Sequence, residues 1–128
     1  MFTKDPESER VIRWYTSCTD EIASAIWCVT EFASALGIKQ RTGQIDVASA
    51  QVAWHQFERF CANDLQLMPV EYATFNRAAM MTLDATTGLR AGDSLHLATA
   101  LEINARNMAT LDGVLAKNAK NMDLLLVL

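Results

Sequence analysis

Short apolar segments with the character of strands alternate with longer segments of helical periodicity along this chain. Such alternation predicts a parallel sheet covered by helices on both faces. The segments 107–111 ("NMATL") and 122–128 ("MDLLLVL") are almost continuously apolar, which is typical of strands buried on both sides. Residues 65–70 form a further strand candidate, and residues 21–27 fit either a buried strand or the start of a helix. The sequence therefore predicts one three-layer α/β domain over residues 1–128.

Helices are expected where apolar residues recur at intervals of three and four. The clearest pattern runs from Asp46, a plausible N-cap, to Ala62. Gly88 is expected to close the helix that precedes it. The expected helices cover residues 6–17, 28–40, 46–62, 71–86, 93–105 and 112–120.

The composition narrows the class of protein. With 128 residues, of which 51% are hydrophobic and 20% charged, the chain can bury the core of one globular domain. A net charge of −4 excludes the basic footprint of a tight duplex-DNA binder. Three cysteines without a C-x-x-C pair are typical of reduced thiols in the cytoplasm. No signal peptide or membrane-spanning run is evident, so we expect a soluble cytoplasmic protein.

Glu31 is the only charged residue between Ile22 and Ile38. A helix that is apolar nearly all round is expected to be buried on most sides. A buried carboxylate without a partner costs several kcal/mol or takes up a proton. Glu31 should therefore face a cation, which could be either an arginine or a metal ion.

Two aspartates stand where apolar segments begin or end. Asp93 opens the apolar helix in "RAGDSLHLATAL", and Asp112 follows the strand candidate "NMATL". Each could be a helix N-cap or a functional acid, and Ser94 could cap the first helix instead. Thr110 lies two residues before Asp112, so it would point to the same face of the strand and could hydrogen-bond to whatever group Asp112 holds.

Together, Glu31, Asp93 and Asp112 suggest a site for Mg²⁺ or Mn²⁺, since these ions prefer oxygen ligands and keep several waters. Such a site can activate water for attack on a phosphodiester. The sequence contains neither a P-loop nor a G-x-S-x-G nucleophile motif. His96 lies one turn into an apolar helix, where a packed histidine is the more common outcome.

"VTEFASAL" and "RAGDSLHLATALEINARNMATLD", together with the order of the elements, resemble the PIN-domain family, and specifically the VapC-type toxins of bacterial toxin–antitoxin pairs. The most specific part of the match runs from Arg90 to Asp112. The resemblance spans nearly the whole chain and is weakest over residues 44–88, where only helix pattern and length agree.

The resemblance implies a compact α/β fold and an Mg²⁺- or Mn²⁺-dependent endoribonuclease, a hydrolase that cleaves RNA. It implies that Asp93 and Asp112 are metal ligands, that Glu31 binds the metal directly or through water, and that Thr110 is a supporting polar group. It also implies a cognate antitoxin protein that blocks the active site, and a homodimer.

One element of the family pattern is missing. PIN-type proteins open with a short apolar strand that ends in an aspartate, the first site carboxylate, and "MFTKDPES" begins beyond that point. We expect this strand, of about 5–6 residues, to lie upstream of Met1. Because it is central in the family's sheet, its absence would leave backbone groups of two neighbouring strands unpaired.

Two other functions remain as alternatives. A catalytically impaired PIN-like domain could act only through antitoxin binding or dimerisation, and the missing aspartate favours it. A receiver-type signalling domain is also small, acidic and α/β. That class needs an acidic pair after its first strand and a lysine after a late strand, and neither is present.

Overall fold

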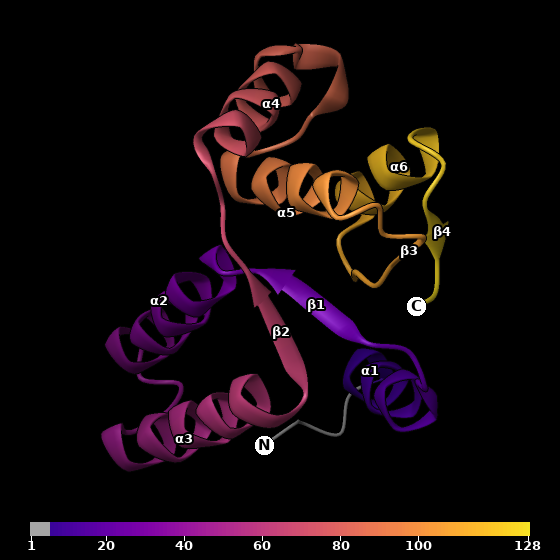
Figure 1. Cartoon of the computed structure of the whole chain (residues 1–128). Coiled ribbons are helices and arrows are strands. Elements are labelled where there is room, and N and C mark those ends of the chain that lie inside the picture. Colours follow the sequence, from indigo (N-terminus) through magenta and orange to yellow (C-terminus); the bar gives the residue numbers. More distant parts are fainter. Residues whose placement is uncertain (1–5) are drawn as a thin grey trace. The chain divides into compact units, whose positions relative to one another are not determined.

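The computed structural model describes residues 6–128, which form six α-helices, one 3₁₀-helix and four short strands (Figure 1). They belong to two compact units. The smaller unit is Glu21–Pro69, and the larger unit combines the chain up to Asp20 with Val70–Leu128. The mixed α/β class and the parallel pairing of strands, both predicted from the alternating pattern, are confirmed.

The smaller unit has the element order β1 (Ile22–Ala25), α2 (Trp27–Arg41), α3 (Val47–Asn63) and β2 (Leu65–Met68). The two strands pair in parallel, with Ile22 opposite Leu65 and Ala25 opposite Met68. A parallel pair needs a long crossover, which here consists of the two helices (Figure 1). Residues 21–27 therefore contain a strand that leads directly into a helix.

The local sequence explains where α3 begins. The Asp46 carboxylate accepts a hydrogen bond from the Ser49 backbone N–H at 2.7 Å, so the predicted cap is confirmed. One face of α3 meets α2 through aromatic rings. Phe57 stacks on Phe32 with ring centroids 4.3 Å apart, and Trp54 lies 6.2 Å from the same Phe32 ring.

The prediction that the helix carrying Glu31 is buried on most sides is wrong. No residue of α2 is buried, and Glu31 is half-buried. In this hairpin one helix face packs against α3, and the apolar residues on the other faces stay accessible. Ile38, on the last turns of α2, is 48% exposed. Apolar residues of a helix are buried only on the face that another element covers.

The larger unit contains α1 (Pro6–Ser17), α4 (Tyr72–Leu83), a 3₁₀-helix η1 (Ala85–Thr87), α5 (Ala91–Glu102), β3 (Asn107–Met108), α6 (Gly113–Asn121) and β4 (Leu125–Leu126). Its core forms around α5, in which Leu97 and Ala98 have no exposed surface. Leu95 of α5 and buried residues of α4, α6 and the connecting segments complete the core: Ala78, Met81, Leu89, Leu115, Ala119 and Leu124.

Buried polar groups tie these helices together. The Thr82 hydroxyl donates to Ser94 Oγ at 2.7 Å, which joins α4 to the start of α5. Asn118 Nδ2, on α6, donates to the Thr87 carbonyl at 2.9 Å. The helix predicted over residues 71–86 ends earlier, at Leu83, and Gly88 instead ends η1 in the left-handed conformation with φ of 68°, which explains the use of glycine there.

The last two strands differ from the prediction. Only two residue pairs, Asn107–Leu125 and Met108–Leu126, form the parallel ladder of β3 and β4. Leu125 is 67% exposed and Leu126 is 41% exposed, so the prediction of strands buried on both faces is wrong. An apolar run becomes buried only where helices cover both sides of a sheet, and a two-residue ladder is too short for such cover.

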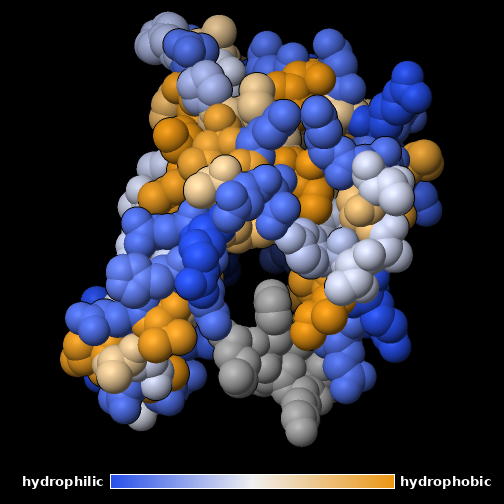
Figure 2. All heavy atoms as spheres, turned by 60° about the horizontal axis from the view of Figure 1, so that its bottom comes forward, coloured by the Kyte–Doolittle hydropathy of each residue, from blue (hydrophilic) through white to orange (hydrophobic). Residues whose placement is uncertain are grey.

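Within the described residues the strands form two separate two-stranded sheets, β1–β2 and β3–β4. Large apolar side chains are accordingly exposed on both units, among them Val47, Val52, Tyr72, Met80 and Leu83. Apolar groups are visible between the hydrophilic ones on the face drawn in Figure 2. Among the described helices, none combines the length and apolar character needed to cross a membrane.

Candidate functional site

Asp93 lies in the first turn of α5 and is half-buried. The N-cap of this helix is Arg90, whose carbonyl accepts from the Ser94 N–H at 2.9 Å. The alternatives that Asp93 or Ser94 caps the helix are therefore wrong, because the helix begins two residues earlier than the sequence pattern indicated. At this position the Asp93 carboxylate is stabilised by the positive end of the helix dipole.

Ser94 anchors the first turn of α5 to α4. Its side chain is fully buried, and its Oγ accepts the hydrogen bond from Thr82. Because Thr82 Oγ1 also contacts the Ala78 carbonyl at 3.0 Å, the start of α5 is fixed against the α4 backbone. The turn that carries Asp93 is thus held by a hydrogen bond between the buried Ser94 and the exposed Thr82, and the sequence pattern of neither residue indicated that role.

Asp112 is the N-cap of α6, so the capping interpretation of this residue is confirmed. Its Oδ1 accepts from the Leu115 N–H at 2.8 Å, and its own N–H donates to Thr110 Oγ1 at 3.1 Å. Thr110 therefore contacts the backbone of Asp112 itself, whereas its expected hydrogen bond to a group held by Asp112 stays a prediction. The side chain is exposed, and a carboxylate has lone pairs beyond the one that a cap uses.

The starts of α5 and α6 contact the same short segment. Asn118, on α6, donates to the Thr87 carbonyl, three residues before the Arg90 cap. A Cβ built on Gly88 would lie 3.6 Å from Val114 Cγ1, so the first turn of α6 packs against the segment that leads into α5. Asp93 and Asp112 therefore belong to two helix N-termini that one packed junction connects.

Glu31 belongs to the smaller unit, on the second turn of α2. Among residues 6–128, no group of three or more His, Cys, Asp or Glu side chains is arranged to hold a metal ion. Of the predicted site residues, those in the larger unit offer two carboxylates, of Asp93 and Asp112, and the hydroxyl of Thr110. These oxygen donors suit Mg²⁺, which commonly takes one or two protein carboxylates and completes its shell with water and phosphate oxygens.

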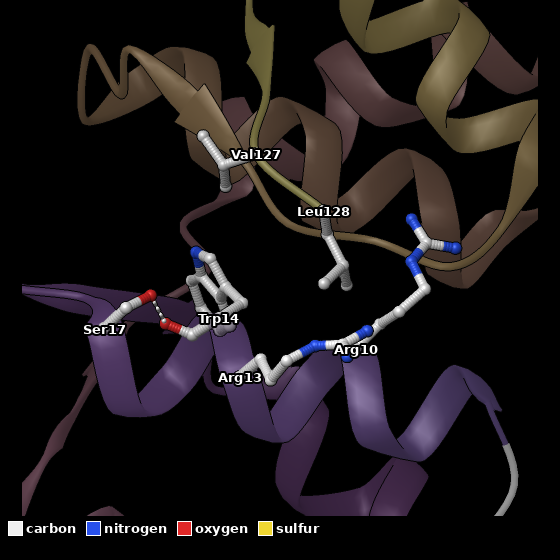
Figure 3. A pocket seen from close by; sticks show the side chains of 6 residues that line it. All are labelled: Arg10, Arg13, Trp14, Ser17, Val127 and Leu128. Carbon is white, nitrogen blue, oxygen red and sulfur yellow. Dashed lines mark hydrogen bonds between the residues drawn. The ribbon is translucent and has the colours of Figure 1, made fainter.

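A pocket of about 290 Å³ lies elsewhere in the larger unit, between α1 and the end of the chain (Figure 3). Arg10, Arg13 and Trp14 line one wall, and Val127 and Leu128 line the other. No predicted site residue lines it. The spacing of Arg10, Arg13 and Trp14 puts all three on one helix face, a signal that the sequence contained and that our interpretation did not use.

Comparison with known proteins identifies no family. No protein-family model matches the sequence, and a search of curated proteins finds no match. The functional assignment accordingly depends on the residues of the site and on the sequence resemblance.

Proposed function

We propose that this chain is a metal-dependent endoribonuclease of the PIN-domain, VapC-toxin type, built on a three-layer α/β domain. The observation that supports it is the junction between α5 and α6. It joins two helix N-termini that carry Asp93 and Asp112, the same two acids that the resemblance over Arg90–Asp112 identifies as metal ligands. Asp93 and Asp112, which are nineteen positions apart in the sequence, thus belong to one packed region.

In this proposal Asp93 and Asp112 hold Mg²⁺ or Mn²⁺, and Glu31 binds it directly or through water. The bound ion would lower the pKa of a water molecule and stabilise charge on the phosphate. Asp93 is oriented by the turn that Ser94 anchors to Thr82. Asp112 is oriented by its contacts with Leu115 and Thr110, which fix the carboxylate and the backbone of the same residue. Pre-oriented ligands reduce the entropy lost when metal and RNA bind.

The same proposal includes the partners that the resemblance implies. The substrate is RNA, the chain forms a homodimer in the cytoplasm, and a cognate antitoxin protein covers the active site.

A second candidate function is a PIN-like domain that binds antitoxin or dimerises without cleaving RNA. Two observations favour it. The described strands form two two-stranded sheets in place of one continuous sheet, and residues 6–128 contain no metal-binding group of three donors.

Mn²⁺ binding and RNA cleavage separate the two functions. The nuclease proposal predicts that the chain binds Mn²⁺ in calorimetry and cleaves a structured RNA with Mn²⁺ but not with EDTA. It also predicts that Asp93→Asn weakens Mn²⁺ binding while the matched variant Asp123→Asn, in the same unit, leaves it unchanged. Asn is tolerated at position 123, where φ is 66°. A folded chain that neither binds Mn²⁺ nor cleaves RNA would support the binding-only function.

A further inference from the structure

The helices α2 and α3 form a hairpin in which they run in opposite directions. Only residues 42–46 connect them, and connections this short join antiparallel neighbours (Figure 1). Their contact is fixed near the middle by the stacked rings of Phe32 and Phe57, with centroids 4.3 Å apart. This pair defines which residues face each other along the rest of the hairpin.

Cys28 and Cys61 lie one helical turn from the stacked rings. Cys28 is four residues before Phe32, and Cys61 is four residues after Phe57. Residues four apart share a helix face, and in an antiparallel pair one turn back on the first helix meets one turn forward on the second. The helix register therefore brings these two thiols opposite each other across the same interface.

The environment of Cys61 agrees with this placement. Burial raises the pKa of the Cys61 thiol, and the neighbouring Cys28 and Glu58 raise the pKa further. Both cysteines are free and half-buried, so a small oxidant can reach them. The third cysteine, Cys18, lies in the other unit, with its Sγ 3.6 Å from the Asp20 carbonyl.

We propose that Cys28 and Cys61 are a redox-active thiol pair that closes into an intrachain disulfide when the protein meets a peroxide. This site is independent of the proposed nuclease activity. It needs only the α2–α3 hairpin, which belongs to the smaller unit.

The oxidation balances with hydrogen peroxide as the two-electron oxidant. One cysteine thiolate attacks a peroxide oxygen, the O–O bond breaks, and the products are a sulfenic acid and, after protonation, water. The second thiolate then attacks the sulfenic sulfur, forms the S–S bond and displaces the hydroxyl group as a second water. Two thiols and one peroxide thus yield one disulfide and two waters, and a thiol reductant reverses the cross-link.

Peptide mapping of the full chain tests the proposal. The protein is treated with hydrogen peroxide, its remaining thiols are alkylated, and it is digested without reductant for mass spectrometry. The expected product is a peptide pair that links Cys28 to Cys61, with Cys18 recovered in alkylated form. The yield should not change on dilution of the protein, because the cross-link forms within one chain.

Serine variants provide the controls. Cys18→Ser should form the cross-link as the parent does, and thiol titration should find two free thiols before oxidation and none after it. Cys28→Ser and Cys61→Ser should each abolish the cross-link and leave a sulfenic acid that dimedone traps on the other residue.

Three results would overturn the proposal. The first is a cross-link from Cys18 to either residue in equal or greater yield. The second is oxidation of Cys28 or Cys61 in the parent chain that stops at the sulfenic acid. The third is a disulfide that forms only between chains and increases with protein concentration.

Discussion

Asp112 is the N-cap of α6 and, in the proposed function, a metal ligand, and two substitutions separate these roles. Its Oδ1 lies 2.8 Å from the Leu115 backbone nitrogen. Asn offers a neutral oxygen to the same N–H and caps helices about as well as Asp, whereas Ala offers none. Asp112→Ala should therefore reduce the free energy of unfolding by about 1 kcal/mol, and Asp112→Asn by much less.

Thermal unfolding and RNA cleavage give the two measurements. A loss of about 1 kcal/mol lowers the Tm of a domain this size by roughly 3–5 °C, so Asp112→Ala should show that shift. Both variants lack the carboxylate charge that holds the metal, and both should lose Mn²⁺-dependent cleavage by about a hundredfold or more. Asp46→Asn is the matched control, since it changes the cap of α3 and should leave cleavage unchanged.

The two roles can fail separately. Cleavage by Asp112→Asn at the parent rate would refute the role of Asp112 as a ligand, whatever its stability. Equal losses of stability in Asp112→Asn and Asp112→Ala would refute the capping argument, because the hydrogen bond to Leu115 would then contribute nothing beyond the charge.

Two further predictions concern stability. Leu97→Ala, at a position with no exposed surface, should lower the free energy of unfolding measured in urea by about 2–5 kcal/mol. Leu83→Ala, at a position 77% exposed, should change this free energy by less than about 0.5 kcal/mol. Similar losses of stability in both variants would contradict a core centred on α5. Hydrogen bonds from Ser49 lower the pKa of Asp46, so its ionised cap stabilises the fold above the pKa of the unfolded chain, near 3.8, and this contribution is lost as the pH falls through the lower folded pKa. The stability advantage of the parent over Asp46→Asn should therefore shrink in urea titrations as the pH falls below about 4, and an advantage that grew there would contradict the sign of the shift.

The order and type of the elements could be predicted from the sequence because they depend on local patterns. Asp46 capped the helix that its position indicated, and Gly88 ended a helical segment where a left-handed residue was needed. Parallel pairing also followed, since strands separated by helices have room for a crossover.

What depends on contacts between distant segments could not be read from those patterns. The apolar run at Leu125 and Leu126 does not show that its sheet is too short for helices to cover. The apolar sequence of α2 likewise does not show that only one face of this helix is packed. The start of α5 was misplaced because Ala91 and Gly92 are small residues without an apolar pattern, which hid the helical turn before Asp93.

The proposed site shows the same division. Sequence position alone indicated that Asp112 begins a helix, but β3 ends at Met108, and the hydrogen bond from the Asp112 N–H to Thr110 was not expected. The junction through Thr87, Gly88 and Asn118 depends on packing across thirty residues, so no local pattern could indicate it. The hydrogen bond between Thr82 and Ser94 could not be predicted for the same reason.

Cleavage of a structured RNA by the parent chain, Asp93→Asn and Asp123→Asn, side by side with Mn²⁺, tests the central proposal most directly. The proposal predicts that the parent and Asp123→Asn cleave at equal kcat/KM, and that Asp93→Asn cleaves about a hundredfold or more slowly while it stays folded, with a Tm lowered only by the loss of its charge at the helix N-terminus. Cleavage by Asp93→Asn at the parent rate would contradict the proposed site. Absence of cleavage by the folded parent would contradict the nuclease function itself.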